Sequence, residues 1–388
     1  MAFFANEAVN RVNIHSAIQA AALGAGGVFF VVFLLRSGLS PPAALTALAF
    51  IFVGRLAVRP LTLPLAKRFG LKPMLIFGTL MMSLQYPALA LVHGVGPGLA
   101  ILIAASCVGD VFYWVNYNSY FAAIGDDGHR GHQIGAREAL VAVVGIIAPL
   151  VGAWGLTRFG PGWTFGAVGL VQTLAAAPLL GVPRASVPQE ANGAFKAAVP
   201  GIVFFAFDGW FDCCFAAVWQ IGLFVSLGES FVAYGGAMAL AAAAGAAASL
   251  LLGRHIDAGG GRRAVLIAYG LTAAVAALRA ASIAHPALAV GANALGGLVI
   301  PVISPTIGAV MYRLGAASPC AFRFFWASEI GWDLGFIAAC LIAAALTWAA
   351  APIAVPILLA LPAAGGSAIF LWRRYRPAMS VAVSLGGV

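Results

Sequence analysis

Two carboxylates within an apolar run are the first candidates for chemistry. Asp208 and Asp212 lie four residues apart within residues 199–227, so on a helix they share one face. An ionisable side chain in a membrane costs about 2.5–3.5 kcal/mol on insertion scales, and two within one turn require a compensating function. Because burial and a neighbouring carboxylate both disfavour the charged form, the pair could take up and release a proton. We expect a role in transport; the structural alternative is that an arginine pairs with these acids and joins two helices.

Polar and aromatic side chains recur at helical spacing in other apolar runs. Asp110, Tyr113 and Tyr117 follow one stripe, and Trp219 continues the stripe of the two aspartates. Aromatic rings supply contact area while a few polar groups set orientation, so such faces suit an amphipathic organic compound. Three acids favour a cationic substrate, protons or both. Further polar side chains within the apolar runs include Gln19, Asn118, Gln220 and Asn293.

Two charged pairs of opposite sign have matching spacing. Arg55 and Arg59 lie four residues apart in one apolar run, and Glu329 and Asp333 lie four apart in another. Each pair is costly if it is left alone in a membrane, so the two pairs could neutralise each other. The competing interpretation is that the arginines bind an anionic solute, which favours uptake. Arg279, near the outer end of a further run, is expected to reach the membrane interface.

A metal site is another alternative. Asp208, Asp212, Cys213, Cys214 and His15 offer carboxylate, thiolate and imidazole donors, which would suit export of a divalent metal ion. Neighbouring cysteines on a helix point about 100° apart, so at most one of them could join the aspartates. We therefore expect no resident metal and no cofactor. The five cysteines show no paired spacing, and no disulfide is expected.

The composition places all these residues in membrane-spanning helices. Of the 388 residues, 62% are hydrophobic and only 9% are charged, which is outside the range of soluble domains. The formal charge of +9 is spread over short gaps between apolar runs, so no nucleic-acid partner is expected. With no nucleophile–base pair, phosphate loop or cofactor fingerprint, an enzyme is not expected either. Twelve runs are long enough to cross a bilayer: 14–35, 43–66, 73–93, 98–124, 138–157, 163–182, 200–227, 231–253, 264–284, 287–312, 323–348 and 353–372.

Charge and repetition orient and divide the chain. Lysine and arginine concentrate in alternate gaps, with only Arg36 and Arg158 on the other side. The positive-inside rule therefore places both termini in the cytoplasm of a multi-pass protein of the inner cell membrane. The longest polar interval follows the sixth run, and residues at an offset of 190 match. The sequence predicts two duplicated six-helix halves, 1–182 and 200–388, joined by a cytoplasmic linker at 183–199.

Two motifs resemble those of a known family. Residues 253–263, Gly-Arg-His-Ile-Asp-Ala-Gly-Gly-Gly-Arg-Arg, resemble the cytoplasmic signature loop of the major facilitator superfamily, with Asp257 as its acid. The first-half counterpart at 63–72 is degenerate and lacks both the first glycine and the acid. Residues 145–153 resemble the antiporter motif of the superfamily. Efflux members carry an arginine before the glycine of the fourth span, and the segment 104–110 has none.

The resemblance implies a fold and a mechanism. It implies twelve helices in two pseudo-symmetric halves around a central cavity, which the first, fourth, seventh and tenth spans line. The polar faces of these spans are then the candidate sites: Asp110, Asp208 and Asp212 for proton coupling, and Gln19, Tyr113, Tyr117, Asn118, Trp219, Gln220 and Asn293 for substrate binding. The resemblance also makes the second and eleventh spans neighbours. We therefore expect Arg55, Arg59, Glu329 and Asp333 to form an interdomain gate, with Asp257 as a further gating residue. The implied protein is a monomeric secondary active transporter in the lipid bilayer that works by alternating access, and we expect proton-coupled export of a small organic compound, cationic and amphipathic in character.

Overall fold

A computed structural model of the chain describes residues 6–124, 130–256 and 261–375, and Asp257 of the predicted gate lies outside them. The described residues form helices and no strands. Within them, twelve stretches are long and apolar enough to cross a membrane, which confirms the predicted all-helical, twelve-span fold. The elements are α1 (Glu7–Ala25), η2 (Gly27–Phe29), α2 (Phe30–Arg36), α3 (Pro41–Phe69), α4 (Leu71–Ala90), α5 (Pro97–Ile124), α6 (Arg130–Arg158), α7 (Gly160–Leu174), α8 (Ala176–Leu180), α9 (Ala194–Asp212), η3 (Cys213–Val218), α10 (Trp219–Ser226), α11 (Phe231–Ile256), α12 (Gly261–Ser282), α13 (Pro286–Gly297), α14 (Val299–Ala317), α15 (Ala321–Trp348), α16 (Ala354–Leu358) and α17 (Ala360–Arg374).

Several spans differ from single straight helices. The first span begins at Glu7, ahead of its predicted start, because the Asn6 side chain caps the helix by accepting a hydrogen bond from the Val9 amide at 3.1 Å. The seventh span joins α9 to α10 through the π-helical segment η3, and the tenth joins α13 to α14. Helix α9 begins at Ala194, so residues 194–199 of the predicted linker are helical.

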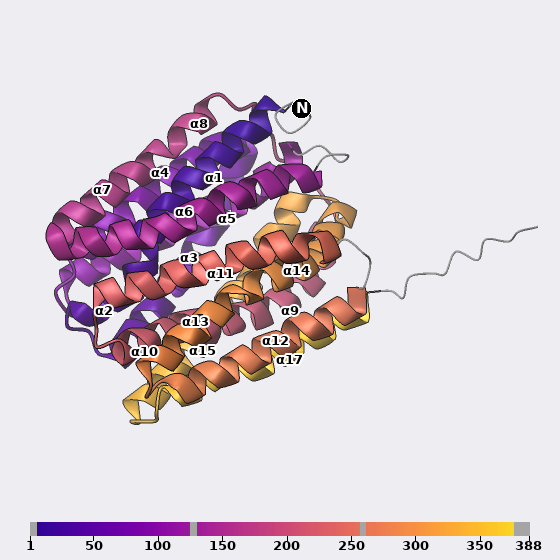
Figure 1. Cartoon of the computed structure of the whole chain (residues 1–388). Coiled ribbons are helices and arrows are strands. Elements are labelled where there is room, and N and C mark those ends of the chain that lie inside the picture. The colour runs from indigo at the N-terminus through magenta and orange to yellow at the C-terminus, as the bar shows by residue number, and fades with distance from the viewer. Residues whose placement is uncertain (1–5, 125–129, 257–260, 376–388) are drawn as a thin grey trace, which may run out of the picture.

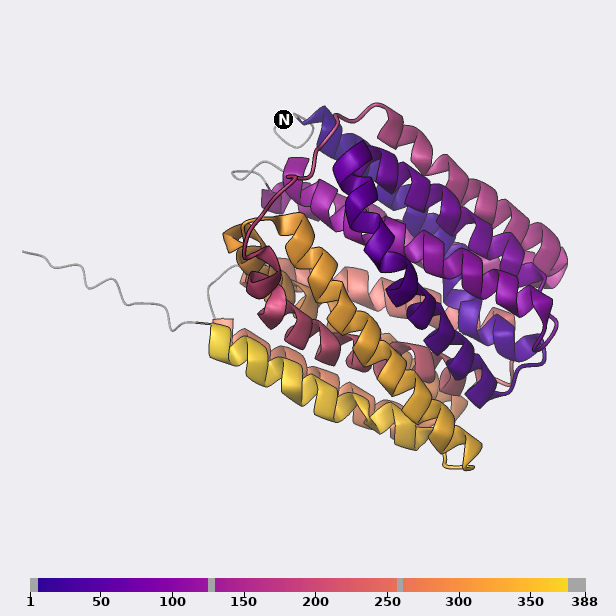
Figure 2. The ribbon, with the colours of Figure 1, turned by 180° about the vertical axis from the view of Figure 1, so that it is seen from behind.

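The helices form two groups that meet along two seams. Figures 1 and 2 show α1–α8 mostly on one side of the molecule and α9–α17 on the other. The groups contact each other where α3 packs on α15 and where α6 packs on α11. On the α6–α11 seam, small residues allow a close approach: a Cβ added at Gly235 would lie 2.7 Å from the Cβ of Ala153 and 2.8 Å from the carbonyl oxygen of Pro149. The exact division of the chain into two halves stays a prediction.

The connection between α8 and α9 is bound to helices of both groups. Lys72 of α4 donates from Nζ to the carbonyl oxygen of Val182 at 2.8 Å. Arg323 of α15 donates from Nη2 to the carbonyl oxygens of Pro188 and Gln189 at 2.9 and 2.8 Å. Because its backbone carbonyls are bonded on both sides, this connection is part of the packed structure.

Glycines bring α9 and α15 into close contact. A Cβ added at Gly209 would collide with the carbonyl oxygen of Trp332, and one added at Gly335 would collide with that of Ala206. Neither collision can be relieved by turning a side chain, because both involve backbone atoms. This packing fixes the position of α9, and with it the position of the two aspartates, against the seam helix α15.

The Gly335→Val variant is expected to lower the free energy of unfolding by about 1–3 kcal/mol, because overpacking forces the two helices apart. The thermal unfolding temperature of the detergent-solubilised protein measures this effect. Gly365→Val on α17 is the matched control, since a Cβ there meets nothing within 4 Å. An equal loss of stability in both variants would contradict the close contact.

Candidate functional site

Two arginines and two carboxylates meet on the α3–α15 seam. Arg55 Nη2 lies 3.1 Å from Oδ1 of Asp333 and 3.7 Å from Oε2 of Glu329. Arg59 Nη1 lies 3.2 Å from Oε2 of Glu329, and its Nη2 pairs closely with Asp333. Arg59 is 1% exposed and Asp333 is 0% exposed. The predicted contact between the two pairs is therefore present, while its role as a gate stays a prediction.

The direction of the two helices explains why the charges meet. Phe52 and Phe336 pack with ring centroids 4.2 Å apart, and further along α3 the Nε1 of Trp326 donates to Oγ1 of Thr62 at 2.8 Å. Rising residue numbers on α3 therefore face falling numbers on α15, and the helices are antiparallel. Four-residue spacing puts each charged pair on one helix face, so the pairs meet between these two contacts.

Asp110 of α5 belongs to the same group of charges. Its Oδ2 lies 3.9 Å from Nη1 of Arg55, so this arginine is shared between α5 and α15. The sequence groups Asp110 with Asp208 and Asp212, whereas the structure places it beside the arginines of the seam. We call Arg55, Arg59, Asp110, Glu329 and Asp333 the seam cluster. With three carboxylates and two guanidinium groups, the cluster has one negative charge in excess when every member is ionised.

The two predicted tyrosines are hydrogen-bonded to α1. His15 Nδ1 lies 2.7 Å from the carbonyl oxygen of Ala175, which can only accept, so Nδ1 carries a proton. In the neutral ring, Nε2 then accepts from the Tyr113 hydroxyl at 3.0 Å. Ser16 Oγ lies 2.8 Å from the Tyr117 hydroxyl. Both tyrosines are buried, so in this conformation they join helices of the first group.

The predicted amide Gln19 is also bonded within the first group. Its Oε1 accepts from Nε2 of Gln172 on α7 at 3.1 Å, and its own amide nitrogen lies 3.8 Å from the Met82 sulfur. Sequence reasoning missed Gln172, because one polar residue in an apolar span has no periodic partner to reveal it. Asn118, the remaining candidate on α5, is half-buried.

Asp208 and Asp212 lie half-buried on α9. Asp208 is within electrostatic reach of Asp212 and of the Tyr269 hydroxyl on α12. Within the part of the chain that the structure describes, neither aspartate forms an ion pair. The alternative in which an arginine neutralises them is therefore not supported by the described side chains.

The π-helical segment η3 changes the stripe that the sequence predicts. Four residues at intervals of four are half-buried along this span: Asp208, Asp212, Ala216 and Gln220. Trp219, predicted for the stripe, is 2% exposed and donates from Nε1 to Oδ1 of Asn293 at 2.9 Å. Asn293 in turn donates from Nδ2 to the carbonyl oxygen of Ala237 at 2.9 Å. These two candidates thus pack inside the second group, and Gln220 takes the place beside the aspartates.

Arg279 is buried, and the prediction that it reaches the membrane interface is wrong. Its side chain is 5% exposed, and Nη1 donates to the carbonyl oxygen of Phe215 in η3 at 2.6 Å. The guanidinium lies 4.1 Å from the ring centroid of Phe215 and 4.9 Å from that of Trp219. These contacts hold the arginine in the bundle, where a cation stacked on aromatic faces regains part of the free energy of solvation that it loses.

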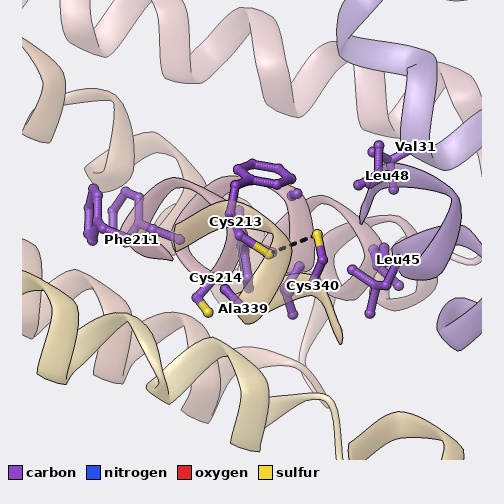
Figure 3. Close-up of a cluster of buried hydrophobic side chains, with 14 of the residues drawn as sticks. Val31, Leu45, Leu48, Phe211, Cys213, Cys214, Ala339 and Cys340 are labelled. Atoms are coloured by element: carbon purple, nitrogen blue, oxygen red, sulfur yellow. Dashed lines mark hydrogen bonds between the residues drawn. The ribbon is translucent and has the colours of Figure 1, made fainter. Parts of the chain in front are cut away.

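The cysteines near Asp212 lie in an apolar environment. Figure 3 shows Cys213, Cys214 and Cys340 among buried hydrophobic side chains, with Cys213 Sγ 3.2 Å from Cys340 Sγ. The sequence does not predict this neighbour. Among the residues that the structure describes, no group of three or more histidine, cysteine or acidic side chains could hold a metal ion. His15, a donor in the metal alternative, instead bonds to groups on other helices.

Comparison with known proteins adds two findings. A family model described as Major Facilitator Superfamily matches residues 14–317. An auto-inhibited POT family peptide transporter superposes with a TM-score of 0.62 at 15% identity, covering 95% of this chain and 97% of its own. A proton-dependent oligopeptide (POT) family transporter superposes with a TM-score of 0.69 at 13% identity, covering 94% of this chain and 100% of its own. No curated protein sequence matches. At these identities the solved structures show a shared fold.

Proposed function

The chain belongs to the major facilitator superfamily, and we propose that it is a proton-coupled secondary transporter that exports a small organic compound by alternating access. The family makes the protein a multi-pass membrane transporter and not an enzyme. The export direction, the protons and the nature of the substrate are the parts that we propose. The observation that carries the proposal is the seam cluster, which joins the two helix groups through buried charges.

The seam cluster supports a gate. Buried ion pairs that link two bodies are strong only while both bodies are in contact, and each charge is costly once its partners leave. A conformation that parts α3 from α15 must therefore bring water to Arg59 and Asp333, which are almost fully buried here. Alternating access supplies such a change, because it exposes opposite sides of a central site in turn. A rigid scaffold would have no need to bury these charges at a contact between groups.

The excess carboxylate in the cluster supports proton coupling. Ionised Asp110 competes with Asp333 and Glu329 for Arg55, and so weakens the hold of α3 on α15. A proton on Asp110 removes this competition and leaves Arg55 to the two α15 carboxylates. Protonation therefore strengthens the seam and deprotonation loosens it, which links a proton to the movement of the gate.

The free aspartate face supports a cationic substrate. Asp208, Asp212 and Gln220 present two carboxyl groups and an amide on one half-buried stripe. Since the described arginines and lysines leave both carboxyl groups without an ion pair, they can receive a proton or a substrate ammonium group in turn. Competition of that kind couples release of one to binding of the other.

The two alternatives from the sequence have less support. Anion uptake requires free guanidinium groups, yet Arg55 and Arg59 are both engaged by carboxylates. Metal-ion export requires clustered donors, yet Cys213 faces Cys340 and His15 is bonded elsewhere. The proposed topology, with both termini cytoplasmic in the inner cell membrane, rests on the distribution of lysine and arginine along the sequence. The proposed monomeric state rests on the resemblance to the family alone.

Transport by purified protein in proteoliposomes tests the proposed function. A panel of amphipathic cations, zwitterions, anions and divalent metal ions is offered under an imposed pH gradient. We expect gradient-driven movement of at least one organic cation, opposite to the proton flow. Gradient dependence for no compound would contradict proton coupling, and movement of metal ions alone would overturn the organic substrate.

The Asp110→Asn variant is expected to slow transport and to flatten its dependence on pH, because Arg55 then stays with α15 at every pH. Initial rates in proteoliposomes, taken at a series of pH values on both sides of neutrality, measure the effect. Glu229→Gln is the matched control, since Glu229 forms an exposed ion pair with Arg36 at 3.8 Å. An unchanged pH profile in Asp110→Asn would contradict the link between this residue and the gate.

A further inference from the structure

The π-helical segment decides which side chains of the seventh span share a face. An α-helix turns by about 100° per residue, so twelve residues from Asp208 to Gln220 would end about 120° away from the starting direction. One additional residue in a π bulge sets the following helix back by about 100°, which leaves Gln220 within about 20° of Asp208. By the same calculation, the π bulge places Trp219 about 80° away from the direction of Asp208. Residues 208, 212, 216 and 220 are all half-buried, which agrees with a helix that the π bulge has set back by about 100°.

Arg279 bonds to the backbone within this segment. Where the backbone hydrogen bonds change from the α-helical to the π-helical pattern, a carbonyl oxygen loses its usual helical amide donor and needs another. Phe215 lies inside η3, and its carbonyl oxygen accepts from Nη1 of Arg279 at 2.6 Å. The guanidinium also covers the rings of Phe215 and Trp219, so it contacts both the carbonyl in the bulge and the ring that the bulge turns inward.

The surroundings are built for this arginine. The neighbouring Gly296 leaves room for its Nη2, because a Cβ at that position would collide with the guanidinium. Trp219 is fixed in turn by Asn293, which is itself bonded to the backbone of α11. Among the described residues Arg279 forms no ion pair. A buried cation without an acidic partner is costly, and here its strongest polar contact is the carbonyl of the bulge.

We propose that Arg279 is a positioning residue: it holds the π bulge of the seventh span and thereby places Gln220, instead of Trp219, beside Asp208 and Asp212. The aspartate face belongs to the proposed function, whereas the register of the helix does not depend on it. Loss of Arg279 removes its hydrogen bond to the Phe215 carbonyl, and the segment then relaxes toward an unbroken α-helix. That change turns Gln220 away from the half-buried face and turns the buried Trp219 toward it, without unfolding the bundle.

Labelling of single introduced cysteines reads the register directly. In the otherwise unaltered protein, Gln220→Cys should react with a water-soluble maleimide, while Trp219→Cys should react as slowly as the native cysteines, which are all buried. Adding Arg279→Gln should reduce labelling at 220 to the rate of Cys213 and Cys340 and raise labelling at 219. Arg279→Lys, which keeps a donor, should retain part of the original pattern. Peptide mass spectrometry quantifies each site separately.

Deletion of Ala217 gives the decisive control. Removing one residue from η3 allows a continuous α-helix that still turns Gln220 toward Asp208, so Arg279 is no longer needed for the register. In the deletion background, Arg279→Gln should leave labelling at position 220 unchanged. General unfolding would instead increase labelling of Cys107 and Cys320 together. Unchanged labelling at 220 in Arg279→Gln without the deletion would overturn the proposal, and because labelling needs no substrate, this outcome is separable from failure of the proposed function.

Discussion

The Asp333→Ala variant is expected to lose transport and to lower the free energy of unfolding by about 3–5 kcal/mol, the cost of breaking a buried ion pair by removing one partner. Asp333 is completely buried and pairs with both arginines of the seam, so its removal leaves two guanidinium groups with one remaining α15 carboxylate. Thermal unfolding in detergent measures the stability, and flux in proteoliposomes measures the transport.

A double variant separates the pairwise contribution from the general damage. Arg59→Ala combined with Asp333→Ala removes both members of the closest pair, so its loss of stability should be smaller than the sum of the two single losses. Additive losses would show that the two side chains do not interact. A charge exchange adds a functional test: Arg55→Glu with Glu329→Arg should recover part of the transport that each single change abolishes. Continued loss in the exchanged variant argues against a gate and for a direct role of the arginines in binding.

Asp208→Asn combined with Asp212→Asn is expected to abolish gradient-driven transport and yet to leave stability unchanged or raised. These carboxyl groups form no ion pair with the described side chains, and an ionisable group in a membrane is destabilising, so a neutral amide of the same size removes a cost. The expected effect on stability is thus opposite in sign to that of Asp333→Ala. Flux of the transported cation is measured with and without the pH gradient, together with the unfolding temperature.

The single variants Asp208→Asn and Asp212→Asn locate the function within the pair. If both transport normally with an unchanged pH dependence, the aspartates have no part in coupling and the structural interpretation holds. A marked loss of stability in either variant would point to a partner that the described residues do not include. Thr173→Ala on α7 serves as a control for loss of a half-buried polar group, because it changes the polarity without changing the charge.

The sequence predicted the fold and the composition of the seam for physical reasons. Apolar runs of bilayer length require helices, because the backbone must satisfy its own hydrogen bonds in lipid. Arg55 and Arg59 lie four residues apart, and so do Glu329 and Asp333. On a regular α-helix this spacing places both side chains of a pair on one face, so the sequence identified two faces of opposite charge. For the seam, the family resemblance added that the second and eleventh spans are neighbours.

The remaining features depend on information that spacing does not contain. Asp110 joins the seam cluster because α5 packs on α3. The residue spacing within one helix does not reveal how far away a neighbouring helix lies or how it is rotated. Trp219 left its predicted stripe because the π bulge breaks the assumed period. The sequence placed Arg279 at the membrane interface because it lies near the end of a helix. In the structure its guanidinium is buried, where it donates to the carbonyl of Phe215 and stacks on two aromatic rings. The contact of Cys213 with Cys340 joins residues far apart in the chain.

The two seams between the helix groups differ in a way that sets how the groups can move. On one edge, α3 and α15 are matched by discrete charge pairs, which fit only in one register. On the other edge, Gly235 of α11 lies against the small side chain of Ala153 on α6, a smooth apolar contact that keeps its character when the helices tilt slightly. We propose that the charge pairs act as a latch along one edge and that the apolar contact acts as a pivot along the other. We expect motion to begin by release of the latch, with the pivot staying closed longest.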